Sequence, residues 1–318
     1  MRLLVTGGAG FIGLNFIEYM LRTHSDVNII CLDALTYAAD EKAVREFEKQ
    51  SNFTFIRGDI RDKAFVFSLF EKYNLDAVVN FAAESHVDRS IESADNFMTT
   101  NILGTQVLLD ACREFGGVRF HQISTDEVYG DLPLDSDECF TENSPLKPSS
   151  PYSASKASAD LLVLSYHRTY SLPVTISRSS NNYGPHQHNE KLIPLMTEKA
   201  FHGEHLPVYG NGLNRRDWIH VTDHCRAVDM ILHKGKVGEI YNVSSETEVS
   251  NLEVVKKLLS SLGKSEDLIS FVKDRPGHDL RYAVDSSKIK SELGWLPQVD
   301  FEKGLAETVE WYIKKLSE

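Results

Sequence analysis

The chain opens with Leu3-Leu4-Val5-Thr6-Gly7-Gly8-Ala9-Gly10-Phe11-Ile12-Gly13, in which an apolar run leads directly into a glycine-rich turn. The run predicts a buried strand, and the residues after Gly10 predict a helix. Glycines let the backbone approach a pyrophosphate, and the N-terminus of the following helix offers unpaired N–H groups to that anion. The spacing is weak on its own, because an ordinary glycine-rich turn between a strand and a helix has the same pattern.

Short apolar runs alternate with longer helical patterns through the first half of the chain. The predicted strands are Leu3–Thr6, Asn28–Leu32, Phe53–Ile56, Ala77–Phe81, Arg119–Ser124 and Val174–Arg178. The predicted helical segments lie near 11–23, 40–49, 62–73, 94–115 and 152–170. This alternation is typical of a parallel sheet covered by helices on both faces. We predict an α/β fold: a Rossmann-type, doubly wound parallel sheet with a smaller, mixed α/β C-terminal substrate lobe.

The domain boundaries follow from where this alternation loosens. Residues 1–178, with about 213–244, are expected to form the dinucleotide-binding domain, and 179–212 with 245–318 the substrate lobe. A stretch at 131–151 contains four prolines among serines and acidic residues, which predicts a long surface loop. The last segment, Glu302–Lys315, predicts an amphipathic helix with Trp311 and Tyr312 packed inward.

Acidic residues after the second and third strands sharpen the dinucleotide interpretation. Asp33 comes 20 residues after Gly13, where a carboxylate binds a ribose 2′-hydroxyl and repels a 2′-phosphate. The third strand is followed by Gly58-Asp59-Ile60, which could flank an adenine. The pattern therefore favours NAD over NADP as the cofactor.

Composition excludes several classes of function. The 318 residues carry a net charge of −12, which disfavours general binding to a nucleic-acid backbone. No apolar run approaches the ~18 residues of a membrane helix, and the first residues do not form a signal peptide. Four scattered cysteines indicate free thiols in a reducing cytosol, so a cytoplasmic protein is expected. Histidine spacings such as 202/205 and 220/224 lack a convincing third ligand, so no metal site is expected.

Tyr152 and Lys156 stand four residues apart at the start of a predicted helix, and therefore share one face. A neighbouring ammonium can lower the pKa of a phenol toward neutrality and make it a base for an alcohol proton. Thr125, at the end of another strand, can donate to the same substrate oxygen. The alternative is a solvated helix start, since this spacing is common by chance.

Asp126 and Glu127 form an adjacent carboxylate pair at the C-terminal end of a predicted strand, where open α/β sheets bind ligands. Crowding pushes the pKa values of two carboxyl groups apart, so that one can act as an acid and the other as a base. Elimination of water needs such a pair. The alternative is two solvated acids at a turn.

These features together resemble the extended short-chain dehydrogenase/reductase family, and within it the dTDP-glucose 4,6-dehydratases. The likeness spans nearly the whole chain. It rests on GGAGFIG (7–13), FAAESHVDRS (81–90), STDEVYG (124–130), PSSPYSASKAS (148–158), SNNYGP (180–185), EKLIP (190–194), RDW (216–218) and DRPGHDLRYA (274–283). Sibling epimerases, decarboxylases and reductases usually lack the Asp–Glu pair, so Asp126 and Glu127 carry much of the subtype.

The resemblance implies oxidation of a sugar at C4, loss of water across C5–C6 and return of the hydride to C6, in the supply of deoxysugars such as rhamnose for surface polysaccharide. It implies that Tyr152, helped by Lys156, takes the proton of the 4-hydroxyl. It also implies that Glu127 removes the C5 proton and that Asp126 protonates the departing 6-hydroxyl. The implied cofactor residues are Gly7, Gly10, Phe11, Ile12, Gly13, Asp33, Asp59, Ile60, Ala82, Ala83, Thr100, Tyr152, Lys156 and Asn181. The implied substrate residues are His86, Thr125, Asn182, Lys191, Leu192, Pro207, Tyr209, Arg216, Asn251, Arg275, His278 and Tyr282.

Two alternatives stay open. A 4-epimerase, or a dehydratase that uses another nucleotide, shares most of these motifs. A non-catalytic dinucleotide-sensing protein would keep the fold without the chemistry, although it has no use for a paired acid and base. The resemblance also implies a homodimer formed through the helices near 94–115 and 152–170.

Overall fold

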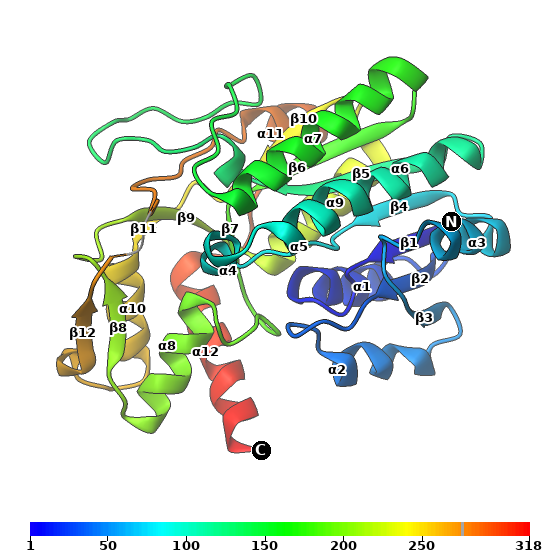
Figure 1. Ribbon diagram of the computed structural model, residues 1–318. Coiled ribbons are helices and arrows are strands. Elements are labelled where there is room, and N and C mark those ends of the chain that lie inside the picture. Colours follow the sequence, from blue (N-terminus) through cyan, green and yellow to red (C-terminus); the bar gives the residue numbers. More distant parts are fainter. Residues whose placement is uncertain (275–276) are drawn as a thin grey trace.

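A parallel sheet forms the centre of the molecule, which a computed structural model describes for residues 1–274 and 277–318 (Figure 1). In this part of the chain the sheet has seven strands, in the spatial order β10 (Ile240–Val243), β6 (Val174–Ser179), β5 (Arg119–Thr125), β4 (Ala77–Asn80), β1 (Arg2–Thr6), β2 (Asn28–Asp33) and β3 (Phe53–Arg57). Leu4 of β1 lies opposite Ile30 on one side and Val78 on the other. The order confirms the doubly wound prediction and adds β10, which the sequence did not predict.

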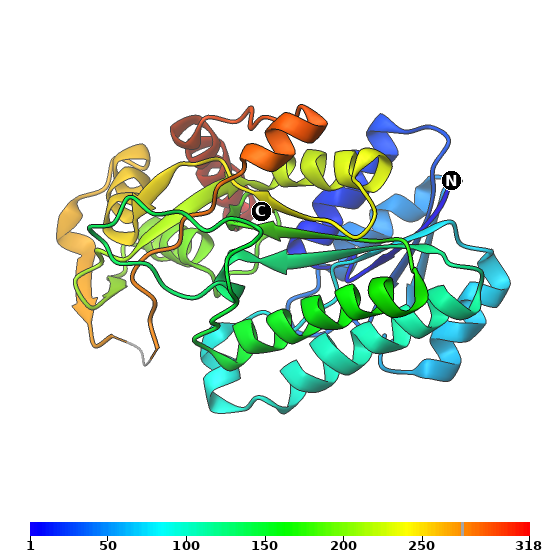
Figure 2. The ribbon, with the colours of Figure 1, turned by 90° about the horizontal axis from the view of Figure 1, so that it is seen from above.

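Helices cover both faces of this sheet (Figure 2). One face carries α3 (Lys63–Tyr73), α6 (Thr105–Glu114) and α7 (Pro151–Tyr170). The other carries α1 (Phe11–Thr23), α2 (Glu41–Glu46) with the short η1 (Phe47–Lys49), and α9 (Val221–Lys234). Side chains alternate along a strand, so Leu4 packs on the first face and Leu3 and Val5 on the second. β1 is therefore apolar on both sides.

The segment predicted as one helix near 94–115 is broken in the structure. After α4 (Val87–Glu92) come α5 (Asp95–Phe97), a π-helical stretch η2 (Met98–Gly104) and then α6. Gly104 packs against Ile60 so closely that a Cβ there would lie 2.5 Å from the Ile60 Cδ1. Wide turns of this kind are frequent at functional sites, and η2 carries Thr100 and Asn101.

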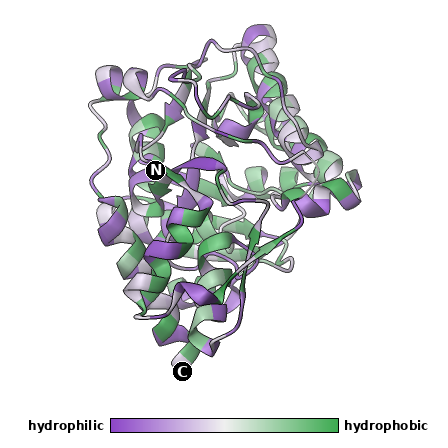
Figure 3. Cartoon of the chain, turned by 90° about the vertical axis from the view of Figure 1, so that its left-hand side faces the viewer, coloured by the Kyte–Doolittle hydropathy of each residue, from purple (hydrophilic) through white to green (hydrophobic). Residues whose placement is uncertain are grey.

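The second lobe lies beyond the carboxyl ends of the main strands. It contains a mixed sheet of β7 (Asn181–Tyr183), β9 (Arg215–His220) and β11 (Glu248–Ser250), and a pair of β8 (Leu206–Tyr209) and β12 (Ile269–Val272). Its helices are α8 (Leu192–His202), α10 (Asn251–Ser261), η4 (Glu266–Leu268) and α12 (Phe301–Ser317). Hydrophobic and hydrophilic residues mix along these helices (Figure 3), and their apolar sides build a separate core around Trp218 and Phe301.

The two lobes interleave along the chain. β10 is a strand of the main sheet and α9 packs on one of its faces, although both come after β7 and α8 of the second lobe in the sequence. We propose the division predicted from sequence, with two qualifications. β9 lies within the range 213–244 predicted for the dinucleotide-binding domain, but it pairs with β7 and β11 of the second lobe. α11 (Ser287–Leu293) and the buried Trp295 pack against α9 and β10. The loop at 131–150 is irregular as predicted, but Leu132 bridges to Arg281 on the second lobe.

Two further expectations can be compared with the structure. Tyr312 is buried as predicted, whereas Trp311 is half-buried, with its ring 4.7 Å from that of His186. Across 1–274 and 277–318, none of the helices has both the length and the apolar character required to traverse a lipid bilayer.

Candidate active site

The glycine loop presents bare backbone at the start of α1. Gly7 has φ +67°, and a Cβ there would lie 2.5 Å from the backbone nitrogen of Ala82. A Cβ on Gly13 would lie 2.3 Å from the carbonyl oxygen of Gly7. Both glycines are therefore required by close backbone approach, and the loop leaves the α1 N-terminus open to an anion.

Two carboxylates follow neighbouring strands beside this loop. Asp33 ends β2, where its Oδ2 accepts the Ala9 N–H at 2.9 Å and its Oδ1 accepts the Leu35 N–H at 2.7 Å, while burial raises its pKa. Asp59 pairs with Arg61 at 2.6 Å, and the hydrogen bonds from this guanidinium lower the pKa of Asp59. The loop and Asp33 are thus tied together, which fixes the carboxylate where a ribose would lie.

A single cleft of about 350 Å³ collects the predicted cofactor residues. All fourteen line it: Gly7, Gly10, Phe11, Ile12, Gly13, Asp33, Asp59, Ile60, Ala82, Ala83, Thr100, Tyr152, Lys156 and Asn181. A glycine-rich phosphate loop at one end, and the half-buried Tyr152 and buried Lys156 at the other, fit a dinucleotide laid along the carboxyl ends of the strands.

The carboxylate pair lies at the end of β5, in the short turn η3 (Asp126–Val128). Asp126 is 1% exposed, and its Oδ2 has no hydrogen-bond partner among the described residues. Burial, followed by the charges of Glu127 and Asp217, raises the Asp126 pKa well above its ordinary value. Glu127 is only half-buried and lines the cleft. The environment therefore favours the protonated form of Asp126, as an acid requires.

Tyr152 and Lys156 both line the cleft from the first turns of α7, but their pKa values differ from expectation. Burial, then the charges of Glu127 and Asp126, raises the Tyr152 pKa instead of lowering it. Burial lowers the Lys156 pKa to about 8, and its Nζ donates to the Ile123 carbonyl oxygen at 2.6 Å. In the ligand-free chain the Tyr152 pKa therefore moves opposite to the predicted direction, because desolvation and two nearby carboxyl groups raise it. The help that Lys156 gives to Tyr152 stays a prediction.

A buried ion pair supports this site from below, and sequence reasoning missed it. Asp160, one turn after Lys156, accepts hydrogen bonds from Arg178 at 2.9 Å and from Ser124 at 3.0 Å. Its charge also partly opposes the fall in the Lys156 pKa. The i, i+4 spacing of Lys156 and Asp160 was the available sequence signal, but Arg178 is brought in by the fold.

The predicted substrate residues divide into two groups. Thr125, Asn182 and Lys191 line the cleft. Outside the cleft lining lie His86, Leu192, Pro207, Tyr209, Arg216, Asn251, His278 and Tyr282, and Arg275 falls outside the described residues. Tyr209 and His278 are neighbours, with ring centroids 6.2 Å apart.

Arg216 and Tyr282 lie behind the acid pair. The Arg216 guanidinium lies 4.3 Å from the centre of the Tyr282 ring and donates to the carbonyl oxygens of Arg215 at 2.8 Å and Asp279 at 2.8 Å. Its charge acts to lower the Asp126 pKa, though less than burial raises it. In this structure Arg216 is therefore buried and bound to carbonyl groups.

Comparison with known proteins agrees with this geometry. The sequence profile of the family described as GDP-mannose 4,6 dehydratase matches residues 4–308. The chain belongs to this family. It is 52% identical to a dTDP-glucose 4,6-dehydratase of Haemophilus influenzae and 53% identical to a low-salt glycan biosynthesis protein of Haloferax volcanii, over 98% of this chain and 98% and 99% of theirs.

A solved structure of a family member shows the same fold. The dTDP-glucose 4,6-dehydratase DesIV of Streptomyces venezuelae, crystallised with NAD, superposes with a TM-score of 0.96 at 47% identity, over 100% of this chain and 98% of that one. This likeness confirms the Rossmann-type fold.

A further cluster of charged and aromatic side chains at the cleft was not predicted from the sequence. Glu190 accepts a hydrogen bond from Tyr37 at 3.0 Å, and its other oxygen lies 3.6 Å from both His86 Nε2 and an Arg89 nitrogen. The Arg89 guanidinium in turn lies 3.6 Å from the centre of the Tyr37 ring. The cluster joins the segment after β2 to the segment before α8. Because these segments are far apart in the sequence, no local sequence pattern predicts the cluster.

Proposed function

We propose that this protein is a dTDP-glucose 4,6-dehydratase, an NAD-dependent hydro-lyase that makes dTDP-4-keto-6-deoxy-glucose. The observation that carries the proposal is the pair of unlike carboxyl groups beside Tyr152. Asp126 is buried with a raised pKa, and Glu127 faces the cleft. The named activities of the 47–52% identical relatives support it.

The proposed reaction uses each residue for one proton. NAD, which the glycine loop would hold, would supply the hydride acceptor for C4, the hydride returned to C6, and positive charge to the site. Tyr152 takes the 4-hydroxyl proton, and Thr125 holds the resulting 4-oxygen. The raised Tyr152 pKa means that the phenol needs extra positive charge nearby, which Lys156 alone does not provide.

The 4-ketone makes the C5 proton acidic, and this is where the carboxyl pair acts. Glu127 removes the C5 proton, and Asp126 delivers its own proton to the 6-hydroxyl, which leaves as water. Return of the hydride to C6, and of the proton from Glu127 to C5, would complete the 6-deoxy sugar and leave the cofactor oxidised as at the start. An epimerase needs neither of these two carboxyl groups, so the pair favours the dehydratase over that alternative. It also argues against a non-catalytic sensor.

An isotope experiment tests the proposal. With dTDP-glucose deuterated at C4, we expect deuterium at C6 of a 4-keto product and no net consumption of added NAD. Label retained at C4 of a galactose product would identify an epimerase instead. The same experiment with UDP-glucose compares turnover of the uracil nucleotide with turnover of the thymine nucleotide.

We also propose a cytoplasmic homodimer, formed through the segment near 94–115, which holds η2 and α6, and through α7. Large apolar side chains are exposed there: Leu103 of η2 is 52% exposed, and Leu161 of α7 is 58% exposed. A second copy would cover both. Sedimentation of Leu161→Glu should show a monomer, and a dimer as stable as wild type would rule out this face.

A further inference from the structure

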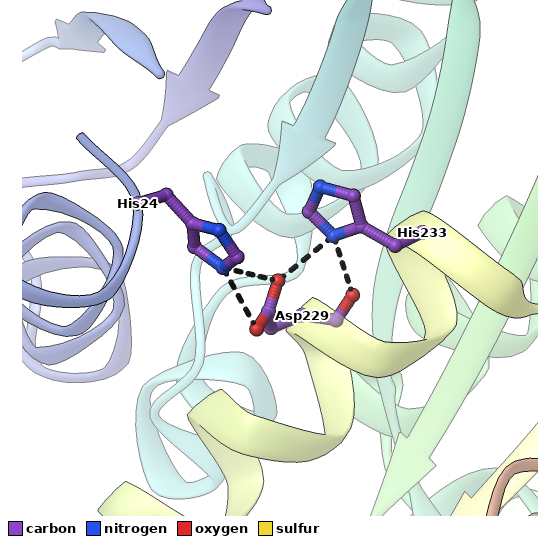
Figure 4. A group of neighbouring side chains, drawn as sticks. All are labelled: His24, Asp229 and His233. Atoms are coloured by element: carbon purple, nitrogen blue, oxygen red, sulfur yellow. Dashed lines mark hydrogen bonds and ion pairs between the residues drawn. The ribbon is translucent and has the colours of Figure 1, made fainter. Parts of the chain in front are cut away.

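Three side chains with metal-binding chemistry meet far from the cleft (Figure 4). His24 directly follows α1, and Asp229 and His233 lie on α9. The His24 Nε2 lies 3.0 Å from both carboxylate oxygens of Asp229, and the His233 Nδ1 lies 2.8 Å from one of them. The two imidazole rings are stacked, with centroids 5.2 Å apart. Two rings thus bracket one carboxylate.

The fold brings these three side chains together, and the sequence spacing does not predict that His24 joins the other two. Asp229 and His233 are four residues apart on a helix and therefore share a face. His24 is 205 residues away from Asp229 and reaches it because α1 packs against α9. Both helices end at the amino edge of the main sheet, opposite the cleft. With 13 residues, α1 separates His24 from the glycine loop by about 20 Å.

The donor set suits zinc. Two imidazole nitrogens and a carboxylate oxygen are ordinary Zn²⁺ ligands, with bonds of about 2.0–2.2 Å. Tetrahedral ligands at that distance stand roughly 3.3 Å from one another. Here the three ligand atoms lie within 4.8 Å of one another, so small side-chain rotations bring them to the required spacing. The rings then bind through the nitrogens that now face Asp229.

A fourth residue already orients the carboxylate. Tyr19 of α1 donates its hydroxyl to Asp229 Oδ2 at 3.1 Å. Hydrogen bonds to a ligating carboxylate are a regular part of metal sites and help to fix its position. Asp229 is 8% exposed, while the side chains of His24 and His233 are 25% and 37% exposed, which leaves a path for an ion and a water.

We propose that His24, Asp229 and His233 form a Zn²⁺ site, completed by one water, that cross-links the end of α1 to α9. The site is separate from the reaction and acts on stability. Because the zinc-binding form of each ring must be unprotonated at the ligating nitrogen, binding weakens as the pH falls.

Calorimetric titration of Zn²⁺ into the chelator-treated full-length protein, carrying no histidine tag, tests the proposal. We expect one ion per chain, and at least a tenfold loss of affinity in each of His24→Gln, His233→Gln and Asp229→Asn, because losing even a second-shell partner costs 10–100-fold. Asp229→Asn keeps the size of the side chain, so it separates binding from folding. His202→Gln, which removes an exposed histidine of α8, is the control and should bind as wild type does.

Two further readouts decide between a metal site and a hydrogen-bonded cluster. Co²⁺ should give the intense visible bands of a four-coordinate ion in wild type and lose them in Asp229→Asn. Zinc at 100-fold above its dissociation constant should raise the folding equilibrium constant about 100-fold, seen as a higher unfolding temperature, with turnover unchanged. Equal zinc affinity in wild type and all three variants, or an octahedral Co²⁺ spectrum in wild type, would overturn the proposal.

Discussion

Replacing Asp126 by Asn tests the proposed acid with little disturbance of the fold. The side chain is 1% exposed and its pKa is raised well above the ordinary value, so burial favours the neutral acid. An amide has nearly the same size and is also neutral. It can still accept the Thr125 hydroxyl, which lies 3.3 Å from Asp126 Oδ1. We therefore expect a change of at most about 1 kcal/mol in the free energy of unfolding.

The effect on turnover should be much larger. A positioned general acid contributes about 10²–10⁴ in rate, which corresponds to roughly 3–5 kcal/mol in the barrier for water loss. Oxidation at C4 does not use this proton. The substituted enzyme should therefore complete the first step and stall at the second.

Rapid-mixing absorbance of reduced nicotinamide follows this stall directly. We expect the signal to rise as fast as in wild type and then to decay about 10²–10⁴-fold more slowly. Asp135→Asn, at an exposed position in the loop after η3, is the matched control and should behave as wild type does. Wild-type turnover in Asp126→Asn, or loss of the initial absorbance rise, would refute the assignment of the acid.

The remaining predictions concern four other positions. Glu127→Gln should suppress exchange of the C5 proton with deuterated solvent, measured by mass spectrometry, and full exchange would point to another base. Gly13→Ala should weaken NAD binding at least about tenfold in a fluorescence titration, because its Cβ would meet the Gly7 carbonyl oxygen at 2.3 Å; unchanged affinity would contradict the close approach. Asp160→Asn should lower the free energy of unfolding in urea by about 3–5 kcal/mol, since it breaks a buried ion pair; a loss below about 1 kcal/mol would show that the pair is not structural. Burial lowers the His121 pKa from 6.5 to about 3. Between these pH values the unfolded chain binds more protons than the folded chain does, so the free energy of unfolding falls as the pH falls through that window. In His121→Gln the acid side of the urea-midpoint curve should be flatter than in wild type, and parallel curves would sink this explanation.

The sequence predicted the features that are local. Six of the seven strands were placed within one residue at each end, because runs such as Leu3–Thr6 are buried on both faces. The glycine loop and the Asp126–Glu127 pair lie at strand ends, so a parallel sheet brings them to one edge. Every predicted cofactor residue and catalytic residue lines the cleft for this reason.

What was missed depends on long-range packing. The α9 helix carries Val221, Cys225, Val228 and Leu232 on one buried face, a spacing that could have revealed it within the region 213–244, where no single helix was predicted. The Asp160–Arg178 pair, the Glu190 cluster and the three side chains of Figure 4 have no such signal, since their members come from distant segments. The raised Tyr152 pKa likewise follows from burial, which spacing does not report.

The late position of β10 has a consequence for how the protein is made. In the finished sheet β6 lies between β5 and β10. During synthesis one edge of β6 stays unpaired until residues 240–243 have left the ribosome, long after the glycine loop and α7. Uncovered strand edges invite pairing with other chains. The nascent protein therefore needs about three quarters of its length before this edge of β6 is paired. A truncation after β6, meant to isolate the nucleotide half, should aggregate instead of folding.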